Sequence, residues 1–369
     1  MIPLYIDPGT GSMLFSIIIG IAATLFFSLR ALAVKLKTVF FTKDAKAANK
    51  TAYPYVIYSE GNQYWNVFKP VLDEFEKRQI VVEYLTSAEN DPVFSAGYEY
   101  VTAEYIGQGN RAFARLNFLS ADVVLMTTPG LDVYQLKRSK TVKHYAHVLH
   151  MASDVTFYRL FGVDYFDSLL LSGDYQKSDI RYLEQQRGLP EKQLVTVGCP
   201  YLDVLKEKFA RIPREENHVF TVLVSPSWGP SALLSRFGEK LLDPLMESGF
   251  QVIVRPHPQS KKSEADVLER LQARYVGREN MHWDFESDNA YSLSRADLMI
   301  SDFSGIIYDY IFLCDKPVMY VSDGFDLMPY DAYDVPHEAW QFSTLKKIGV
   351  QLTEEDFPRI GEVIRQMAD

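Results

Sequence analysis

Cysteine and positive charge are both scarce in this chain of 369 residues. Its two cysteines, Cys199 and Cys314, lie far apart and form no CxxC pair, which argues against a disulfide framework and favours a reducing compartment. Lys and Arg number 38 against 48 Asp and Glu, giving a formal net charge of −10, so we expect no nucleic-acid partner. Any phosphate must therefore be bound locally, by helix N-termini and a few placed side chains.

Long uncharged runs are also rare, and one lies near the amino terminus. Residues 12–29 (SMLFSIIIGIAATLFFSL) carry no charge, and at about 1.5 Å per residue they span roughly 27 Å, close to one hydrocarbon core. Lys and Arg follow this run but do not precede it, so the positive-inside rule predicts a single-pass anchor in the inner (cytoplasmic) membrane, with the N-terminus outside and the catalytic domains in the cytoplasm. The alternative interpretation is a buried amphipathic helix of a soluble protein.

Beyond residue 50, short apolar runs alternate with helical periodicity, and a charged stretch at 206–218 interrupts the alternation. Continuous apolar strands separated by helices are typical of parallel sheets covered on both faces. We therefore predict an α/β protein with two Rossmann-like domains preceded by one transmembrane helix. The boundaries are an anchor and linker at 1–50, an acceptor-side domain at 51–210 and a nucleotide-donor domain at 218–369.

The same pattern predicts individual elements. A last helix, from Glu354 onward, is expected to pack back on the first half. The other helices are expected at 63–78, 233–248, 263–275 and 304–313. The expected strands cover 54–59, 80–85, 122–127, 144–149, 168–173 and 194–198 in the first half, and 219–225, 251–256, 281–285, 297–301 and 317–321 in the second.

The sharpest motif is SDFSGIIYDY at residues 301–310. A buried strand is predicted to end just before Asp302, and a helix to begin at Ser304, a favourable N-cap residue. Gly305 would let a ligand approach the backbone, and the N–H groups of a first helical turn suit a phosphate. We expect the donor phosphates to bind here, with Asp302, Ser304 and Gly305 among the donor-binding residues. The alternative is that Ser304 only caps the helix and Asp302 only closes a turn.

Two more loops follow predicted strands. In RPHP (255–258) two prolines fix the loop and hold Arg255 and His257 near the carboxyl edge of the sheet. Arg can neutralise a phosphate, and His can hydrogen-bond it or transfer a proton. SPSWGP (225–230) offers the small hydroxyl of Ser227 for a phosphate pocket, without a GxGxxG fingerprint.

Three histidines, His144, His147 and His150, fall within one short segment. If the segment is a strand, His147 faces away from the other two, so the three cannot converge on one metal ion. His150 then lies at the carboxyl end of the strand, where a general base would face the cleft. No DxD-like ligand set is present, and we expect neither a metal nor another cofactor.

These residues resemble the CDP-glycerol glycerophosphotransferase family, the teichoic-acid primases and polymerases. The resemblance spans most of residues 53–325 and is carried by RPHP, by SDFSGIIYDY followed by KPVMYV, and by GCPYLDVL at 198–205. It implies the two-domain GT-B architecture and transfer of glycerol phosphate from CDP-glycerol to an acceptor hydroxyl, with release of CMP. It also implies that His257 contacts the donor phosphates or assists proton transfer, and that Ser304, its following amides and Asp309 hold the donor.

The chain departs from the family after His150. The family usually has His-Gly-Thr there, whereas this chain has Met151, Ala152 and Ser153. We expect a membrane-associated transferase that moves glycerol phosphate, or a related alditol phosphate, from a CDP-linked donor to a lipid-linked or polymer acceptor, with His150 and His257 as catalytic residues. Two alternatives stay open: a GT-B glycosyltransferase or epimerase-like enzyme that uses a UDP-sugar, and a catalytically silent membrane-tethered scaffold.

Overall fold

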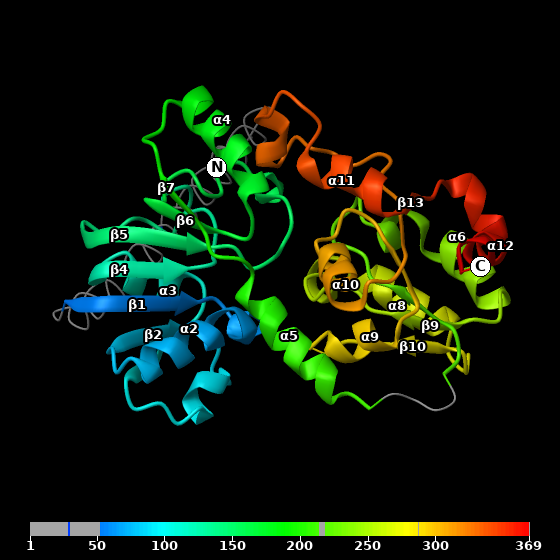
Figure 1. Cartoon of the computed structure of the whole chain (residues 1–369), viewed down its shortest axis with the longest axis horizontal. Coiled ribbons are helices and arrows are strands. Elements are labelled where there is room, and N and C mark those ends of the chain that lie inside the picture. The colour runs from blue at the N-terminus through cyan, green and yellow to red at the C-terminus, as the bar shows by residue number, and fades with distance from the viewer. Residues whose placement is uncertain (1–28, 30–51, 214–217, 287, 369) are drawn as a thin grey trace, which may run out of the picture.

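The structure, a computed structural model, describes residues 29, 52–213, 218–286 and 288–368, and its two parallel sheets lie side by side (Figure 1). This confirms the predicted pair of α/β domains. Within the described ranges, no helix combines the length and apolar character that a bilayer span requires. The expected anchor, residues 12–29, lies outside the described residues except for Leu29.

The first domain is built on a seven-stranded sheet in the order β3-β2-β1-β4-β5-β6-β7, with every neighbouring pair parallel. The chain builds the sheet outward from β1 to β3 and then crosses back to β4, which creates a switch point between β1 and β4. The strands are β1 (Tyr53–Ser59), β2 (Val82–Thr86), β3 (Val101–Tyr105), β4 (Ser120–Met126), β5 (Thr141–Val148), β6 (Ser168–Leu171) and β7 (Gln193–Thr196), and the α-helices are α2 (Trp65–Lys77), α3 (Asn110–Leu116) and α4 (Lys177–Arg187).

The second domain repeats this plan with six parallel strands in the order β10-β9-β8-β11-β12-β13. Its switch point lies between β8 and β11. The strands are β8 (Thr221–Val224), β9 (Gln251–Val254), β10 (Met281–Trp283), β11 (Leu298–Ser301), β12 (Val318–Tyr320) and β13 (Val350–Gln351), and the α-helices are α6 (Leu233–Glu247), α7 (Ser260–Ser263), α8 (Ala265–Arg274), α9 (Ala290–Arg295), α10 (Ile306–Cys314), α11 (Trp340–Ile348) and α12 (Ile360–Ala368).

Every expected strand is present within a few residues of its predicted bounds, but β3 and β13 were missed. All four residues of β8 and of β11 are buried, as expected for strands covered on both faces. By contrast, β3 is an edge strand with no fully buried residue, and the two residues of β13 are exposed. Strands like these carry too little apolar sequence to be recognised.

A single helix, α5 (Pro200–Arg211), connects the two domains along one side (Figure 1). The charged stretch at 206–218, which we interpreted as the domain boundary, is helical over residues 206–211. Pro200 occupies the first turn, where a missing N–H costs nothing, and Leu205 is buried between the domains. The charged residues Lys206, Glu207 and Arg211 lie on the exposed side of this amphipathic helix.

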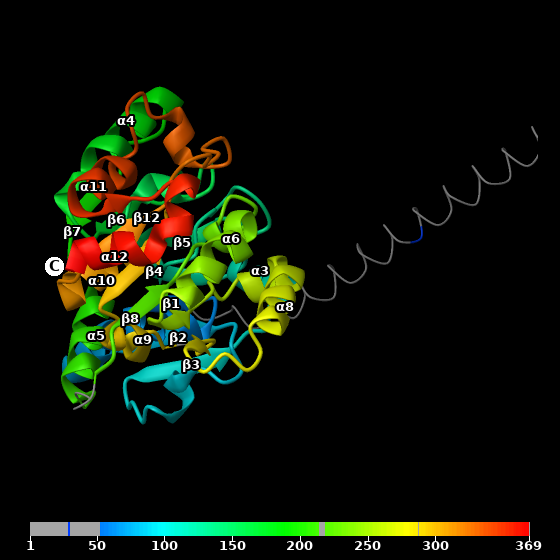
Figure 2. The same cartoon turned by 90° about the vertical axis from the view of Figure 1, so that its right-hand side faces the viewer.

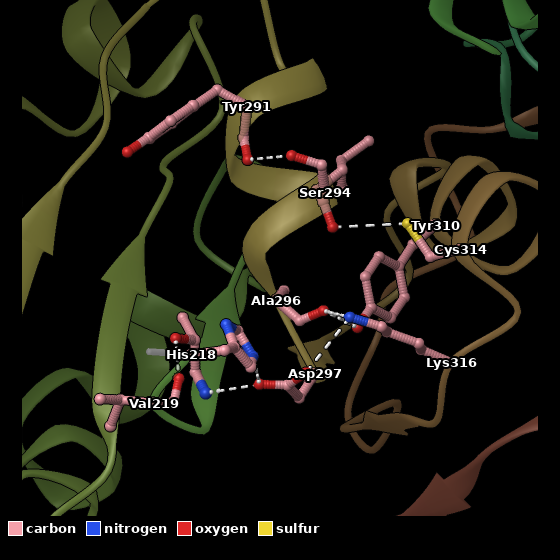
Figure 3. Close-up of polar contacts among 11 residues, drawn as sticks. His218, Val219, Tyr291, Ser294, Ala296, Asp297, Tyr310, Cys314 and Lys316 are labelled. Atoms are coloured by element: carbon pink, nitrogen blue, oxygen red, sulfur yellow. Dashed lines mark hydrogen bonds and ion pairs between the residues drawn. The ribbon is translucent and has the colours of Figure 1, made fainter. Parts of the chain in front are cut away.

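Asp297 directly precedes β11 and bonds to residues at the start of β8, where the chain enters the second sheet (Figure 3). Its carboxylate accepts hydrogen bonds from His218 Nε2 at 2.5 Å, Thr221 N at 2.9 Å and Lys316 Nζ at 3.2 Å. Burial alone would raise the pKa of Asp297, but these bonds outweigh it and hold the pKa below its usual range. Lys316 also donates to the Ala296 carbonyl at 2.6 Å. The start of β8 is thereby tied to β11 and to the α10–β12 connection.

The segment 323–342, here called the arm, leaves the second domain and lies against the first. Backbone hydrogen bonds join Leu160 N to Pro329 O and Asp331 N to Tyr158 O, both at 3.0 Å. Further along the arm, Trp340 stacks on the Tyr175 ring with centroids 4.0 Å apart. In Figure 1 the arm approaches the first domain near α4, across the molecule from α5. The two domains are thus joined at two separate places.

The C-terminal segment packs on its own domain, so the prediction that it returns to the first half was wrong. The Phe357 ring packs edge to face on Phe237 of α6, with ring centroids 5.2 Å apart. Arg365 donates a hydrogen bond to Ser248 O at 2.8 Å. Figures 1 and 2 show α12 beside α6, on the second domain. The apolar side of α12, which includes Ile360 and Ile364, completes the core of the second domain.

Candidate functional site

A cavity of about 650 Å³ lies between the two domains, at the carboxyl ends of strands from both sheets. This is where open α/β sheets bind their ligands. The cavity is large enough for a nucleotide-sized molecule. Seven of the eight residues predicted from the sequence line it, and Asp302 does not; the seven are His150, Ser227, Arg255, His257, Ser304, Gly305 and Asp309.

His150 enters the cavity just beyond the end of β5. Its Nδ1 lies 2.8 Å from Thr127 Oγ1 and 3.3 Å from the Tyr158 hydroxyl. Burial, reinforced by the nearby imidazole of His257, lowers the pKa of His150 to about 4. His150 is therefore neutral at pH 7 and able to accept a proton.

The other two histidines of this segment make separate contacts. His144 Nε2 lies 2.9 Å from Ser168 Oγ, whereas His147 is fully buried with Nε2 3.1 Å from the Tyr158 hydroxyl. Burial lowers the pKa of His147 to about 3. Tyr158 thus touches both His147 and His150, a link that strand periodicity alone could not predict.

His257 faces His150 from the second domain. Its Nδ1 accepts a hydrogen bond from Gln259 N at 3.1 Å, so in the neutral ring the proton is on Nε2. Burial lowers the pKa of His257 to about 4, although Glu264 partly opposes the shift. A neutral imidazole with Nε2–H is a hydrogen-bond donor for a phosphate oxygen. Trp228 lies beside the His257 ring, with centroids 6.2 Å apart.

Arg255 does not present a free charge to the cavity, contrary to the expectation that it neutralises a phosphate. Its side chain is buried, and its guanidinium forms an ion pair with Asp284 and donates to Glu286 O at 2.7 Å. The positive charge of Arg255 is balanced by the Asp284 carboxylate and is therefore not free to neutralise a ligand phosphate. Arg255 therefore serves to fix the loop that carries His257.

Asp302 was predicted to bind the donor, but the structure places it beneath the cavity. Its carboxylate accepts from the backbone N–H of Ser227 at 2.9 Å, of Ser304 at 3.1 Å and of Leu233 at 2.9 Å. Asp302 therefore ties the loop after β8 to the loop after β11 at the switch point. Burial raises the pKa of Asp302 to about 6, against the lowering effect of these bonds. The position of Ser227 at the cavity wall depends on this tie.

The prediction that Ser304 caps α10 was wrong. The helix begins at Ile306, and Gly305 is its N-cap residue without a side-chain bond. Ser304 lines the cavity instead. A Cβ built on Gly305 would lie 3.1 Å from Met151 Sδ and 3.3 Å from Ser153 Oγ. The space above Gly305 is therefore filled by the first domain, through Ser153 and through Met151, which stands where the family has Gly.

Asp309 lies in the first turn of α10 and is buried. Burial raises the pKa of its carboxyl to about 8, so the group is mostly protonated at pH 7. Its Oδ1 has no hydrogen-bond partner among the described residues. A neutral carboxyl can donate as well as accept a hydrogen bond.

Several residues of the cavity wall were not predicted. Phe157 and Tyr330 meet Phe303 and Phe325 in an aromatic cluster across the domain boundary, and Arg159 lies over the Trp228 ring at 5.9 Å. Only Phe303 and Trp228 belong to motifs recognised in the sequence, whereas Phe157, Arg159, Phe325 and Tyr330 do not. They reach the cavity because the arm brings segments distant in sequence together, and a single sequence carries no signal for that contact.

Comparison with known proteins places this geometry in a family. The profile of the CDP-Glycerol:Poly(glycerophosphate) glycerophosphotransferase family matches residues 25–334. No curated protein matches the chain significantly in sequence.

Solved structures share the fold. The wall teichoic acid polymerase TagF is similar with a TM-score of 0.52 at 11% identity, over 93% of this chain and 91% of that one. The UDP-GlcNAc 2-epimerase of Methanocaldococcus jannaschii is similar with a TM-score of 0.56 at 13% identity, over 85% and 92%. At these identities the likeness establishes the two-domain fold alone. The family profile covers most of the chain, and the chain therefore belongs to the CDP-glycerol:poly(glycerophosphate) glycerophosphotransferase family, whose members are transferases.

Proposed function

We propose that this protein transfers glycerol phosphate, or a related alditol phosphate, from a CDP-linked donor to an acceptor hydroxyl during synthesis of a cell-envelope polymer. The observation that carries the proposal is the pairing of His150 and His257 across one cavity, one from each domain. Both imidazoles are neutral at pH 7, so one can accept a proton while the other donates a hydrogen bond.

The reaction is a direct displacement at the phosphorus that carries the alditol. His150 Nε2 takes the proton of the acceptor hydroxyl as its oxygen attacks, and the bond from that phosphorus to the bridging oxygen of the diphosphate breaks. CMP leaves with the bonding electrons. His257 donates to a phosphate oxygen, and Ser227 and Ser304 line the same wall. Positioning and electrostatics supply most of the rate in such transfers.

The acceptor belongs to the same proposal. We infer that residues 12–29 anchor the chain in the cytoplasmic membrane, with both domains in the cytoplasm, and that the acceptor is lipid-linked or a growing polymer. The uncharged run and the basic residues after it support this inference. Confinement to one surface would raise the effective concentration of a lipid-linked acceptor without any added contact.

The test uses the full chain in detergent micelles. Thermal unfolding is followed with CDP-glycerol, CMP, UDP-GlcNAc or UMP, since a ligand of the folded state raises stability by RT ln(1 + [L]/Kd). We expect selective stabilisation by the cytidine compounds and its reduction in His257→Ala. A uridine preference would instead support sugar chemistry on the same fold, and no response from folded protein would support a silent scaffold.

A further inference from the structure

Buried polar side-chain atoms in folded proteins nearly always have a hydrogen-bond partner, so each exception needs an explanation. Among the described residues, three of the exceptions line the cavity between the domains: Ser153 Oγ, Asp309 Oδ1 and Gln341 Oε1. All three side chains are more than nine-tenths buried. Burying such groups without a partner is costly, so a ligand that bonds to them would remove that cost.

These three residues come from different segments that meet at the start of α10. Ser153 Oγ lies 3.3 Å from the position of a Cβ on Gly305, and Asp309 is one helical turn further along. Gln341, on the first turn of α11, donates through its Nε2 to the Phe303 carbonyl. Its backbone N–H donates to Asp154 Oδ2 at 3.1 Å, next to Ser153. Both domains therefore contribute to one end of the cavity.

The three side chains at this end of the cavity are largely uncharged at pH 7. It offers a hydroxyl, an amide oxygen and a carboxyl that burial keeps largely protonated, since the pKa of Asp309 is raised to about 8. Such groups complement hydroxyls, which both donate and accept. A phosphate fits them poorly, because its oxygens would face the carbonyl-type oxygens of Asp309 and Gln341.

We propose that Ser153, Asp309 and Gln341 form a subsite for the vicinal hydroxyls of the alditol that the donor carries. This inference rests on the proposed function and specifies the part of the donor that is recognised. The donor phosphates then lie toward His257, and the alditol points toward the start of α10. Ser153 follows Met151 and Ala152, which stand where the family has Gly and Thr, so the departure from the family motif lies next to the subsite.

The test is calorimetric titration of the full chain with CDP-glycerol, CMP and CDP-1,2-propanediol, which lacks the terminal hydroxyl. We expect the wild type to prefer CDP-glycerol over CDP-1,2-propanediol by about tenfold, as the loss of one or two hydrogen bonds to a buried site would give. Ser153→Ala and Asp309→Asn should reduce that preference to about twofold while leaving CMP affinity unchanged. Ser153→Ala should fold normally, because Ser153 Oγ makes no bond that would be lost.

Thr128→Val is the matched control. Thr128 Oγ1 is also buried and lacks a partner among the described residues, but it does not line the cavity, so this variant should keep the full preference. Equal wild-type affinity for CDP-glycerol and CDP-1,2-propanediol would overturn the subsite and leave the proposed function standing. Equal weakening of CMP and CDP-glycerol in Ser153→Ala would assign the site to the ribose diol and also overturn it. A wild type that binds none of the three ligands would overturn the proposed function itself.

Discussion

The Tyr158 hydroxyl lies between two imidazoles, 3.3 Å from His150 Nδ1 and 3.1 Å from His147 Nε2. With Nε2 as the base, Nδ1 carries a hydrogen before and after proton transfer, so the Tyr158 hydroxyl can accept from it in both states. Thr127 Oγ1, at 2.8 Å, supports the same nitrogen. The proposed base is thus oriented by hydroxyls.

Replacing Tyr158 with Phe should lower kcat about tenfold and leave KM for the donor nearly unchanged, because Tyr158 positions the base without lying between donor and acceptor. The measurement is the rate of acceptor-dependent CMP release over a range of pH. Tyr165→Phe removes the hydroxyl of an exposed tyrosine that does not line the cavity, and it should leave the rate unchanged. A Tyr158→Phe enzyme with wild-type kcat would show that Thr127 alone orients His150.

Acid should destabilise the protein through its buried histidines. His147 has a folded-state pKa of about 3 against roughly 6.5 when unfolded, so the unfolded chain binds the proton first and stability falls as pH drops from about 6.5 toward 3. Each such group contributes about 1.4 kcal/mol per pH unit within that window. Urea unfolding at pH 7, 6 and 5 should therefore show a shallower decline in His147→Phe than in the wild type. An identical decline would assign the acid sensitivity to other groups.

Arg187 should be critical for keeping the arm in place. Its guanidinium contacts Asp164 and Asp331 at 2.8 Å and Asp334 at 2.6 Å. Arg187→Met would leave buried carboxylates unpaired and should cost about 3–5 kcal/mol in the free energy of unfolding, with faster proteolysis within 323–342.

Arg270→Met is the control for this prediction. The Arg270–Glu239 pair is largely exposed, so its loss should cost less than about 1 kcal/mol. Equal destabilisation by the two variants would mean that the arm is not held by Arg187.

The close contact between Gly305 and Met151 predicts a coupled pair of substitutions. Gly305→Ala places a methyl 3.1 Å from Met151 Sδ and should destabilise the protein by about 1 kcal/mol or more. In a Met151→Ala background the same change should cost clearly less, because only the contact with Ser153 remains tight. A double-mutant cycle in urea measures this coupling, and strictly additive effects would show that Met151 moves aside freely.

Much of this structure is accessible from the sequence because parallel strands buried on both faces have a strong local signature. The strands that carry SDFSG, RPHP and SPSWGP were all expected, and topology alone then brings His150 and His257 to one cavity. The sequence did not predict the roles of side chains whose partners lie far away along the chain. Arg255 is a residue type that often binds phosphate, but its guanidinium is paired with Asp284. The Asp302 carboxylate accepts hydrogen bonds from three backbone N–H groups instead of binding a ligand.

The arm is the other part that the sequence did not predict. Residues 323–342 are rich in aromatic and acidic side chains without a regular period, and their structure depends on contacts with the first domain. The roles of Ser153 and Gln341 could not be predicted for the same reason, because the cavity that they line forms only where the two domains meet.

The two attachments between the domains have a mechanical consequence. With α5 on one side of the cavity and the arm on the other, the halves cannot swing apart about α5 alone while the Arg187 contacts persist. Relative motion is then restricted to rotation about the line through both attachments. Such a twist would change the relative positions of His150 and His257, one on each domain, without separating the two domains.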